Sequence, residues 1–412
     1  MFNQIPHNVK VKLLTNFTGS IVYRAVFPFV ALYLNDLVGS VLTGSLISLT
    51  VISSYFMRLV GGYLADIHSR KKIVLIGNSL NFISMAIMTL SILKFNNMPY
   101  IFVLGYIIHI SFVPISGPSM QALIIDSTPP KMRKDVYTIT YWSMNVAASF
   151  GYFFGGMMYE SHKGLLFSLL TITSLFTVIS YYIFLEDSNK NKKQTTKSNI
   201  IKNMLNHYSV AIKDYSFLLT VIGMGLLLVG EEMMPGYVAI RLKDLFFSFK
   251  FMGVNITGVK MLSIIMLENT IFVIFLTLIA NKITDKWSRK NVMIVSLTLY
   301  CIGFIGLSYS LGFSSLLLFG LINSIGETVA IPLVGAEQTQ LMPKEHRASY
   351  IALSSLSHRE AAFIGGFLIS IKHIFRAPIM TFIISLIIIL GVVSILRGIY
   401  GNKSIPKIKN YS

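Results

Sequence analysis

The chain has 412 residues, of which 54% are hydrophobic and only 13% are charged. A soluble globular protein carries about a quarter charged residues, so this composition excludes a soluble enzyme. The formal net charge of +18 does not indicate a nucleic-acid partner, because the basic residues lie in short loops and no soluble basic domain is present to bind one.

The apolar residues form unbroken blocks of about 20 residues or more, the length that crosses the hydrocarbon core of a bilayer. Such blocks lie at about 11–34, 41–65, 73–93, 99–124, 136–159 and 164–185 in the first half of the chain, and at about 214–240, 256–280, 291–311, 314–342, 348–371 and 376–400 in the second. The sequence therefore predicts an all-α integral membrane protein with twelve transmembrane helices.

Between the two sets of blocks lies a polar segment, residues 187–213, rich in Lys, Asn, Ser and Thr. We interpret it as a cytoplasmic linker between an N-terminal six-helix bundle (1–186) and a C-terminal one (214–400), with 401–412 as a basic tail. Residues 200–212 fit an amphipathic helix on the inner leaflet. Most of the 35 Lys and Arg residues fall in loops on the linker side. We therefore expect a multi-pass protein of the cell membrane with both termini cytoplasmic.

The chain carries a single cysteine, Cys301, inside a predicted span, which excludes intramolecular disulfides and a thiolate metal site. It contains no Walker loop, no His-Glu-x-x-His motif and no nucleophile elbow. We therefore expect neither an ATP-driven pump nor an enzyme, and no cofactor or metal beyond a proton gradient as energy source. The expected partners are the lipid bilayer and a small-molecule substrate, with no nucleic acid, and the chain is expected to be monomeric.

A charged hairpin between the second and third spans, Gly61–Lys72, repeats half a chain later as Asn281–Lys290. A second pair of stretches, Pro130–Tyr137 and Pro343–Tyr350, agrees at nearly constant offset. Two matched pairs indicate a duplicated chain, and internal repeats are the usual build of secondary transporters.

The pattern Gly62-x-x-x-Asp66-x-x-x-Arg70-Lys71-Lys72 resembles the signature loop between the second and third helices of the major facilitator superfamily. The resemblance covers nearly the whole chain and implies that superfamily's fold, two pseudo-symmetric six-helix bundles. Within it, the chain looks most like drug/proton antiporters of the lactococcal multidrug-transporter type. The landmarks shared with them are Ala65-Asp66, Ile124-Ile125-Asp126, Tyr141-Trp142 and Gly326-Glu327.

Carboxylates within the spans are the candidates for proton coupling, because an ionisable side chain in lipid usually faces a partner or a wet cavity. Glu327 lies in the middle of the tenth span, where a carboxylate could take up and release a proton as solvent access alternates. The resemblance gives the same role to Glu231, just before Pro235, with Glu232 as a near rival. Asp126, at the inner end of the fourth span, is the third candidate.

Several other charged or titratable residues in spans have a structural alternative. Arg58 would pair with Asp66 or a carbonyl at the inner rim, His109 would pack, and Lys260 and Glu268 would pair or reach toward the outer interface. The glycine cluster of the fifth span, 151–156, serves either helix packing or a directional role that the resemblance implies.

The inner hairpins are predicted to form a conformational latch. Asp66 and Asp126 end their spans close to basic residues, and such ion pairs would hold the cytoplasmic side shut. Protonation of Asp126 would weaken the latch and so link proton uptake to motion. The predicted latch residues are Gly62, Asp66, Arg70, Lys71, Asp285 and Arg289.

The substrate is expected to contact Arg24, Tyr141, Trp142, Glu231, Glu232, Glu327, Arg359 and Glu360. Compared with the antiporters that the chain resembles, Thr140 stands where an acidic residue is expected, and Arg24 stands where a small one is. Two functions therefore stay open. One is proton-coupled export of amphipathic drugs by alternating access. The other is dedicated export of an endogenous anionic metabolite, such as a carboxylate siderophore or a peptide-like product, because guanidinium binds carboxylates bidentately.

Overall fold

The computed structural model describes residues 5–94, 98–129, 132–187, 212–284, 287–343, 347–354 and 357–401. In these ranges the chain is almost wholly helical, and nine helical segments are long and apolar enough to cross a membrane. One of them, 7–65, runs for 59 residues and contains two of the predicted spans. The predicted all-α membrane fold is therefore confirmed. Nearly all of the predicted linker and the tail lie outside the described residues.

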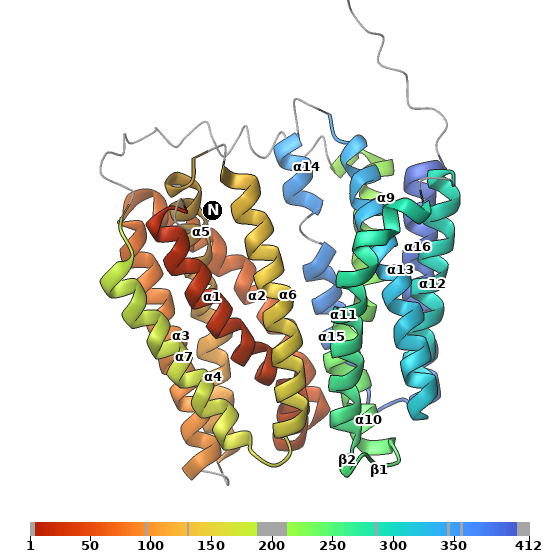
Figure 1. Ribbon diagram of the computed structural model, residues 1–412, viewed down its shortest axis with the longest axis horizontal. Coiled ribbons are helices and arrows are strands. Elements are labelled where there is room, and N and C mark those ends of the chain that lie inside the picture. The colour runs from red at the N-terminus through yellow and green to blue at the C-terminus, as the bar shows by residue number, and fades with distance from the viewer. Residues whose placement is uncertain are drawn as a thin grey trace, which may run out of the picture. The chain divides into compact units, whose positions relative to one another are not determined.

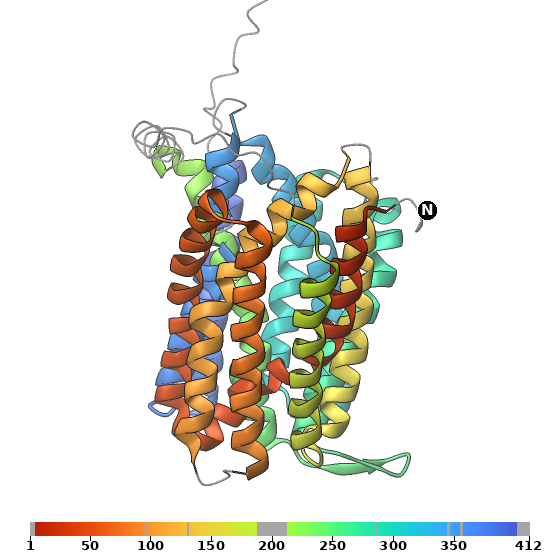
Figure 2. The same cartoon turned by 90° about the vertical axis from the view of Figure 1, so that its left-hand side faces the viewer.

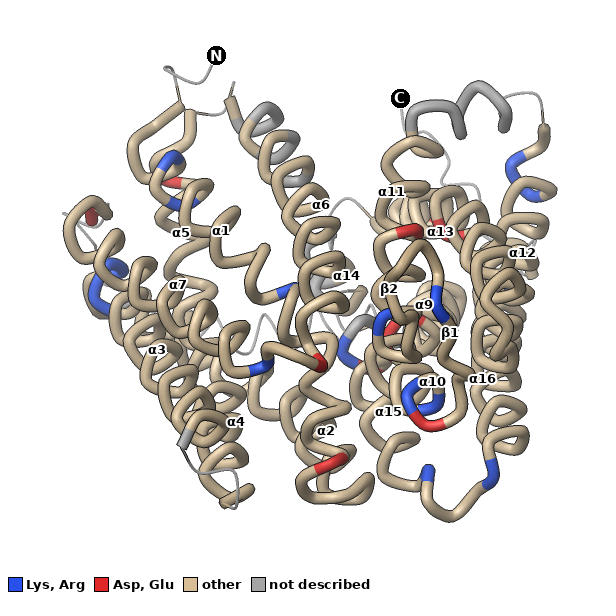
Figure 3. Tube along the Cα trace, turned by 60° about the horizontal axis from the view of Figure 1, so that its bottom comes forward, with Lys and Arg blue, Asp and Glu red and all other residues tan. Residues whose placement is uncertain are grey.

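The first half of the chain forms long helices that run side by side (Figures 1 and 2). In order they are α1 His7–Val26, η2 Phe27–Phe29, α2 Val30–Ile67, α3 Arg70–Lys94, α4 Pro99–Phe112, η3 Val113–Ile115, α5 Ser116–Ser127, α6 Arg133–Met158 and α7 Lys163–Phe184, where η2 and η3 are 3₁₀ turns. Most charged positions lie near the helix ends (Figure 3), as the cost of burying charge in hydrocarbon requires.

Proline and glycine interrupt two of the predicted spans of this half. The span expected at 11–34 is broken at η2, which contains Pro28, and the span expected at 99–124 is broken at η3, which contains Pro114. Proline has no backbone N–H to donate to the preceding turn. Gly39 has a φ of 77° inside α2, a left-handed conformation that glycine adopts without strain. This residue marks the expected boundary between the first two spans.

The second half contains α9 Tyr215–Met233, η5 Met234–Val238, α10 Ala239–Leu245, β1 Phe249–Phe251, β2 Val254–Ile256, α11 Gly258–Thr284, α12 Arg289–Tyr309, α13 Phe313–Gln340, α14 Arg347–Ser354, α15 Ser357–Ile371 and α16 Ala377–Tyr400. The α9 helix begins at an N-cap, because the Asp214 carboxylate accepts a hydrogen bond from the Phe217 N–H at 3.1 Å. Pro235 and Gly236 lie in the π-helical turn η5, which leads directly into α10.

A short hairpin that the sequence analysis did not predict follows α10. Strands β1 and β2 pair antiparallel, with Phe249 opposite Ile256 and Phe251 opposite Val254. The two turn residues, Met252 and Gly253, both have positive φ, 47° and 82°, as the tightest hairpin turns require.

Contacts within the chain define two compact units. One comprises residues 1–193, 235–271 and 366–374, and the other comprises 194–234, 272–365 and 375–412. The first unit thus includes α10, the hairpin, the first half of α11 and the end of α15 together with the helices of the first half. The division into bundles at 1–186 and 214–400 stays a prediction.

Glycines permit the closest helix contacts in the second unit. Where α9 crosses α16, a Cβ on Gly223 would lie 2.8 Å from the carbonyl oxygen of Gly391. Where α12 crosses α13, a Cβ on Gly303 or Gly326 would overlap the backbone of the facing helix at Asn323 or Tyr300. Helices approach this closely in membranes mainly where the contact residues are small.

Two glycines of α13 give a matched test of this packing. Gly326→Ala is expected to lower the free energy of unfolding by about 1–3 kcal/mol, because the added methyl group overlaps the α12 backbone. Gly335→Ala should raise it by up to about 1 kcal/mol, because its Cβ would enter open space and alanine favours the helix. Thermal denaturation can be followed with a thiol-reactive dye, since the single cysteine is buried. Equal melting temperatures for the two variants would contradict this account.

Candidate functional site

Three of the predicted carboxylates gather in the second unit. Glu231 and Glu232 occupy the last turn of α9, and Glu327 lies near the middle of α13. Glu231 interacts electrostatically with both Glu327 and Glu232. Its side chain is exposed, whereas those of Glu232 and Glu327 are half-buried. We call Glu231, Glu232 and Glu327 the carboxylate cluster. The sequence analysis named all three residues, and the structure brings them together.

The packing of α12 positions this cluster. Gly326 lies against the backbone of Tyr300, so the next residue, Glu327, is turned away from α12. Tyr300 itself is fully buried and donates a hydrogen bond from its hydroxyl to the Leu227 carbonyl of α9 at 3.3 Å. Tyr300 therefore contacts α9 through its hydroxyl and α13 through its backbone at Gly326, so it packs between the helices that carry Glu231 and Glu327.

A fourth predicted carboxylate reaches α9 from α15. The Glu360 carboxyl group lies against Gly225, where a side chain on α9 would collide with it. Glu360 and its neighbour Arg359 are both half-buried. The side chain of His358, which precedes them, lies outside the described residues. The second unit therefore presents acidic groups on α9, α13 and α15, and a cation beside one of them.

In each of the two repeated hairpins an arginine that begins a helix forms an ion pair, at helix ends that the sequence places inside. Arg70, the first residue of α3, donates to the Asp126 carboxylate at the end of α5. In the second unit Arg289, the first residue of α12, pairs with Glu337 near the end of α13 at 3.2 Å. The pairing of Arg70 with Asp126 agrees with the predicted latch. The sequence analysis missed Glu337, because Glu337 does not fall at the position equivalent to Asp126 when the two hairpins are aligned.

The remaining latch residues are only partly described. The side chain of Asp66 and the whole of Asp285 lie outside the described residues. The Lys71 ammonium donates to the Tyr182 carbonyl at 2.9 Å and so anchors α7. The close helix approach expected of the glycine pair belongs to Gly61, which packs on the Ile115 carbonyl of η3, whereas a Cβ on Gly62 would meet open space.

The two inner ion pairs should differ in which substitution destabilises the protein. Loss of the acid should cost more in the first pair, and loss of the base should cost more in the second. Arg70 is the buried member of the first pair, with 14% of its side chain exposed against 45% for Asp126. Glu337 is the buried member of the second, with 13% exposed against 70% for Arg289. Removing a partner is costly when the charge left behind is out of water.

Asp126→Asn and Arg289→Met should therefore each lower the free energy of unfolding by about 1–3 kcal/mol. Arg70→Met and Glu337→Gln should each change it by less than about 1 kcal/mol. The melting temperatures of the four variants, measured with the thiol-reactive dye, test this order. A larger loss for Arg70→Met than for Asp126→Asn would contradict the assignment of the buried member.

The substrate residues predicted in the first half lie on α1 and α6. The Arg24 guanidinium donates to the Tyr152 hydroxyl at 2.7 Å and lies over its ring. Gly151 allows this approach, because a side chain there would overlap Arg24 and the Ile21 carbonyl. Trp142 is exposed on α6, and the Tyr141 side chain lies outside the described residues. Arg24 is thus held by an uncharged partner.

The histidine of the fourth span packs, as the structural alternative expected. The His109 ring makes a 3.1 Å hydrogen bond with the Asn81 side chain and lies 4.9 Å from the Phe27 ring. Lys260, which the sequence analysis considered together with Glu268, donates instead to the Asn255 carbonyl of the hairpin at 2.8 Å.

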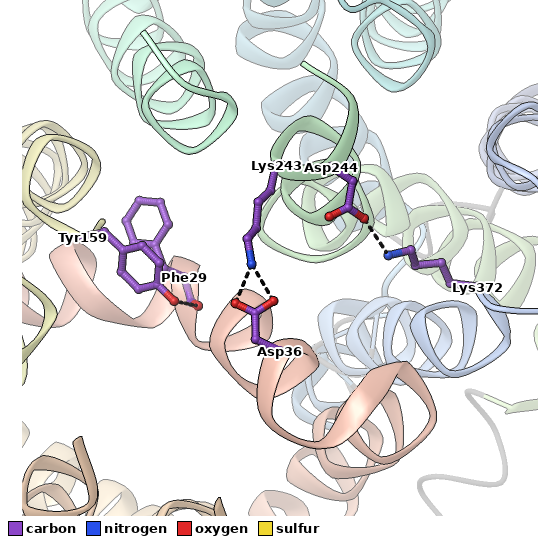
Figure 4. Close-up of polar contacts among 6 residues, drawn as sticks. All are labelled: Phe29, Asp36, Tyr159, Lys243, Asp244 and Lys372. Carbon is purple, nitrogen blue, oxygen red and sulfur yellow. Dashed lines mark hydrogen bonds and ion pairs between the residues drawn. The ribbon is translucent and has the colours of Figure 1, made fainter. Parts of the chain in front are cut away.

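A set of ion pairs that the sequence analysis missed joins segments from both halves of the chain within the first unit. The Lys243 ammonium on α10 contacts both carboxylate oxygens of Asp36 on α2 (Figure 4). The neighbouring Asp244 accepts from Lys372, after α15, at 3.5 Å. We call these four residues the outer contact set, since they lie at helix ends that the sequence places outside. The sequence feature that could have indicated these ion pairs is the presence of charged residues in three short loops predicted to lie outside.

Small residues bring the same segments close. Gly44 on α2 packs against Ser370 and the Gly366 carbonyl of α15, and Gly156 on α6 packs against Ser263 of α11. In addition, the Thr257 hydroxyl, before α11, donates to the Glu160 carboxylate after α6 at 2.8 Å. Helices of the first half are therefore joined to α10, α11 and α15 by both apolar and charged contacts.

The sequence model of the family named Major Facilitator Superfamily matches this chain over residues 13–267 and 247–407. A curated relative, the Na(+), Li(+), K(+)/H(+) antiporter of Planococcus maritimus, is 24% identical over 369 residues, which cover 85% of this chain and 86% of that protein.

The fold is similar to that of solved transporters. A structure of the nucleoside transporter NupG has a TM-score of 0.74 at 14% identity and covers 95% of this chain and 99% of that one. A POT family transporter in complex with 5-aminolevulinic acid has a TM-score of 0.69 at 15% identity and covers 95% and 96%. At such identities the likeness shows the fold alone. With a family model that matches nearly the whole chain, this protein is a membrane transporter that belongs to the major facilitator superfamily.

Proposed function

We propose that the protein is a proton-coupled antiporter that exports small molecules by alternating access. The observation that carries this proposal is the carboxylate cluster, in which Glu231 of α9 and Glu327 of α13 interact within one unit. Two carboxylates held close together in a membrane protein favour states in which a proton or a bound cation neutralises part of their charge. An antiporter must alternate between a state that carries the proton and a state that carries the cargo.

In the proposed cycle, two sets of ion pairs open and close the two sides of the protein. The inner pairs Arg70–Asp126 and Arg289–Glu337 and the outer contact set would form and break in turn as access changes sides. Ion pairs suit such a role, because each inner pair has one exposed member and can exchange its partner for water when that side of the protein opens. The mechanism needs no bound cofactor, since the proton gradient supplies the energy.

Two cargo classes are favoured by specific observations. Amphipathic drugs fit the resemblance to drug/proton antiporters and the exposed Trp142 and Tyr23 side chains. Monovalent cations fit the name of the relative from Planococcus maritimus and the acidic character of the carboxylate cluster. The remaining alternative is an anionic metabolite, suggested by the sequence position of Arg24.

The experiment uses the purified full-length protein in proteoliposomes that contain a pH-sensitive dye. Na⁺, Li⁺, K⁺ and an amphipathic cationic dye such as ethidium are added in turn. We expect at least one of them to move protons in the opposite direction, and a protonophore should abolish the signal. If cargo crosses the membrane at the same rate with and without a pH gradient, and no protons move, the protein is not a proton-coupled antiporter.

A further inference from the structure

The helices of the first half enclose a cavity that the proposed mechanism does not use. Its volume is about 480 Å³, and its walls come from α1, α3, α5, α6 and α7. All of the lining residues belong to the first unit, between residues 9 and 181. The carboxylate cluster lies in the second unit, and none of its three residues lines this cavity.

The charge of the cavity is positive. Among the described residues that line it, Lys12 is the single charged one, and no aspartate or glutamate is present. Lys12 lies one turn before Asn16 on α1, so the two side chains share a face. In the described part of the chain neither side chain has a hydrogen-bond or ion-pair partner. The cavity therefore offers an ammonium group and an amide whose donors are available.

Two further amides contribute to the same lining. Gln121 on α5 also has no side-chain partner among the described residues, and it is exposed to the cavity side of its helix. Asn78 on α3 donates its amide N–H to the Val74 carbonyl at 2.8 Å, which leaves its carbonyl oxygen available. Asn16 and Asn78 are half-buried and Gln121 is exposed, so these amide groups are accessible to a polar ligand that enters the cavity.

Apolar side chains and hydroxyl groups share the rest of the wall. Leu13, Met85, Met120 and Leu170 line the cavity, and all four are buried. A ligand that satisfies both parts of the wall carries a compact polar head and an apolar body, as small-molecule pockets generally require. Since the charge is on Lys12, that head is an acid: an ammonium and amide N–H groups donate to a carboxylate, whereas an organic cation would meet a like charge without a counter-ion.

We propose that this cavity binds an amphipathic carboxylate, with the acid at Lys12, Asn16 and Gln121 and the apolar body against Met85, Met120 and Leu170. Lys12 lies near the start of α1, which the sequence places on the cytoplasmic side, so the site is loaded from inside or from the inner leaflet. The identification of the bound acid as cargo rests on the proposed antiport. The proposal that the cavity binds the acid does not depend on the antiport.

The test compares two fluorescent probes that differ only in their charge. Dansylaminoundecanoic acid carries a carboxylate, and a dansylaminoundecyl trimethylammonium salt carries a cation on the same body. Fluorescence titration with the full-length protein in nanodiscs should show saturable binding of the acid probe above the lipid background. The ammonium probe should not bind at this site. Equal saturable binding of both probes would overturn the proposal.

Variants locate the site. Gly19 lines the cavity, and a Cβ there would meet nothing within 4 Å, so Gly19→Leu adds bulk beside the cavity and should abolish binding of the acid probe. Lys12→Gln should weaken binding about tenfold or more, because a hydrogen bond to a charged group is lost. Leu14→Phe adds similar bulk to the exposed face of the same helix and should leave binding unchanged. Unaltered binding of the acid in both cavity variants would overturn the proposal.

Transport of the acid probe in proteoliposomes then separates the two proposals. Saturable binding of the acid together with its proton-linked transport supports both the binding site and the antiport. Binding that Gly19→Leu removes, without any transport of the acid, supports the site and identifies its occupant as a bilayer fatty acid rather than cargo. Proton-linked export of another molecule, without binding of the acid, supports the antiport and overturns the site. Retention of the wild-type melting temperature by Lys12→Gln excludes misfolding as the cause of a loss.

Discussion

Glu327→Gln is expected to abolish substrate-driven proton movement in proteoliposomes, with a fall of at least about tenfold in its initial rate. The glutamine keeps the shape of the side chain but cannot carry the proton that the carboxylate pair with Glu231 exchanges. The rate is read from a trapped pH-sensitive dye after addition of the cargo identified in the panel of cations and dyes. Cargo that still exchanges across the membrane without protons is compatible with this outcome.

A matched control lies on the same helix. Glu337→Gln changes another glutamate of α13, but that residue is paired with Arg289 at the inner end and is not part of the carboxylate cluster. Because Glu337 belongs to an inner ion pair of the proposed cycle, Glu337→Gln should change proton movement and cargo exchange by the same factor and leave the coupling between them intact. Glu231→Gln should resemble Glu327→Gln, because the pair acts as a unit and loss of either member removes it. Full activity of Glu327→Gln would show that proton coupling does not pass through the cluster.

Reversal of one charge in the outer contact set is expected to slow transport several-fold, and reversal of both to restore it. In Asp36→Lys two ammonium groups meet where Lys243 now contacts the carboxylate. The folded protein should survive, since both side chains are more than a third exposed and such pairs contribute about 1 kcal/mol or less to stability. An effect of that size still shifts a two-state equilibrium several-fold, so transport should fall by a similar factor.

The double variant Asp36→Lys/Lys243→Asp should recover most of the wild-type rate, because the pair is restored with its charges exchanged. Lys372→Gln serves as the milder comparison, since its contact to Asp244 is longer, at 3.5 Å. The transport rate of the double variant is compared with those of Asp36→Lys and Lys243→Asp. If the double variant is no faster than the two single variants, the residues act separately rather than as a pair.

A cysteine pair tests whether this contact must open. In a Cys301→Ser background, Asp36→Cys/Lys243→Cys places two thiols on α2 and α10, where the present side chains meet (Figure 4). An oxidative cross-link should stop transport, and reduction should restore it. Transport that continues with the link intact would show that the outer contact set does not separate during the cycle.

Much of the architecture could be predicted from the sequence, because a bilayer imposes length and apolarity on every spanning helix. The all-α membrane fold, the family and the repeated hairpins were readable from block length and from motif spacing. The acidic residues of α9 and α13 were readable as well, since a charge inside an apolar block is conspicuous. Their assembly into one cluster agrees with the roles inferred for them, although those roles stay proposals.

The tertiary structure decided what depends on contacts between distant segments. The meeting of Asp36 with Lys243, more than two hundred residues apart in sequence, has no local signal, because a charge in a loop is ordinary. The same holds for Glu337 as the partner of Arg289, and for the choice of Gly61 over Gly62 as the contact glycine. Composition and period determine which residues enter the membrane. Which of them touch depends on helix rotation, and rotation is set by close packing at a few small residues that the sequence does not distinguish from the others.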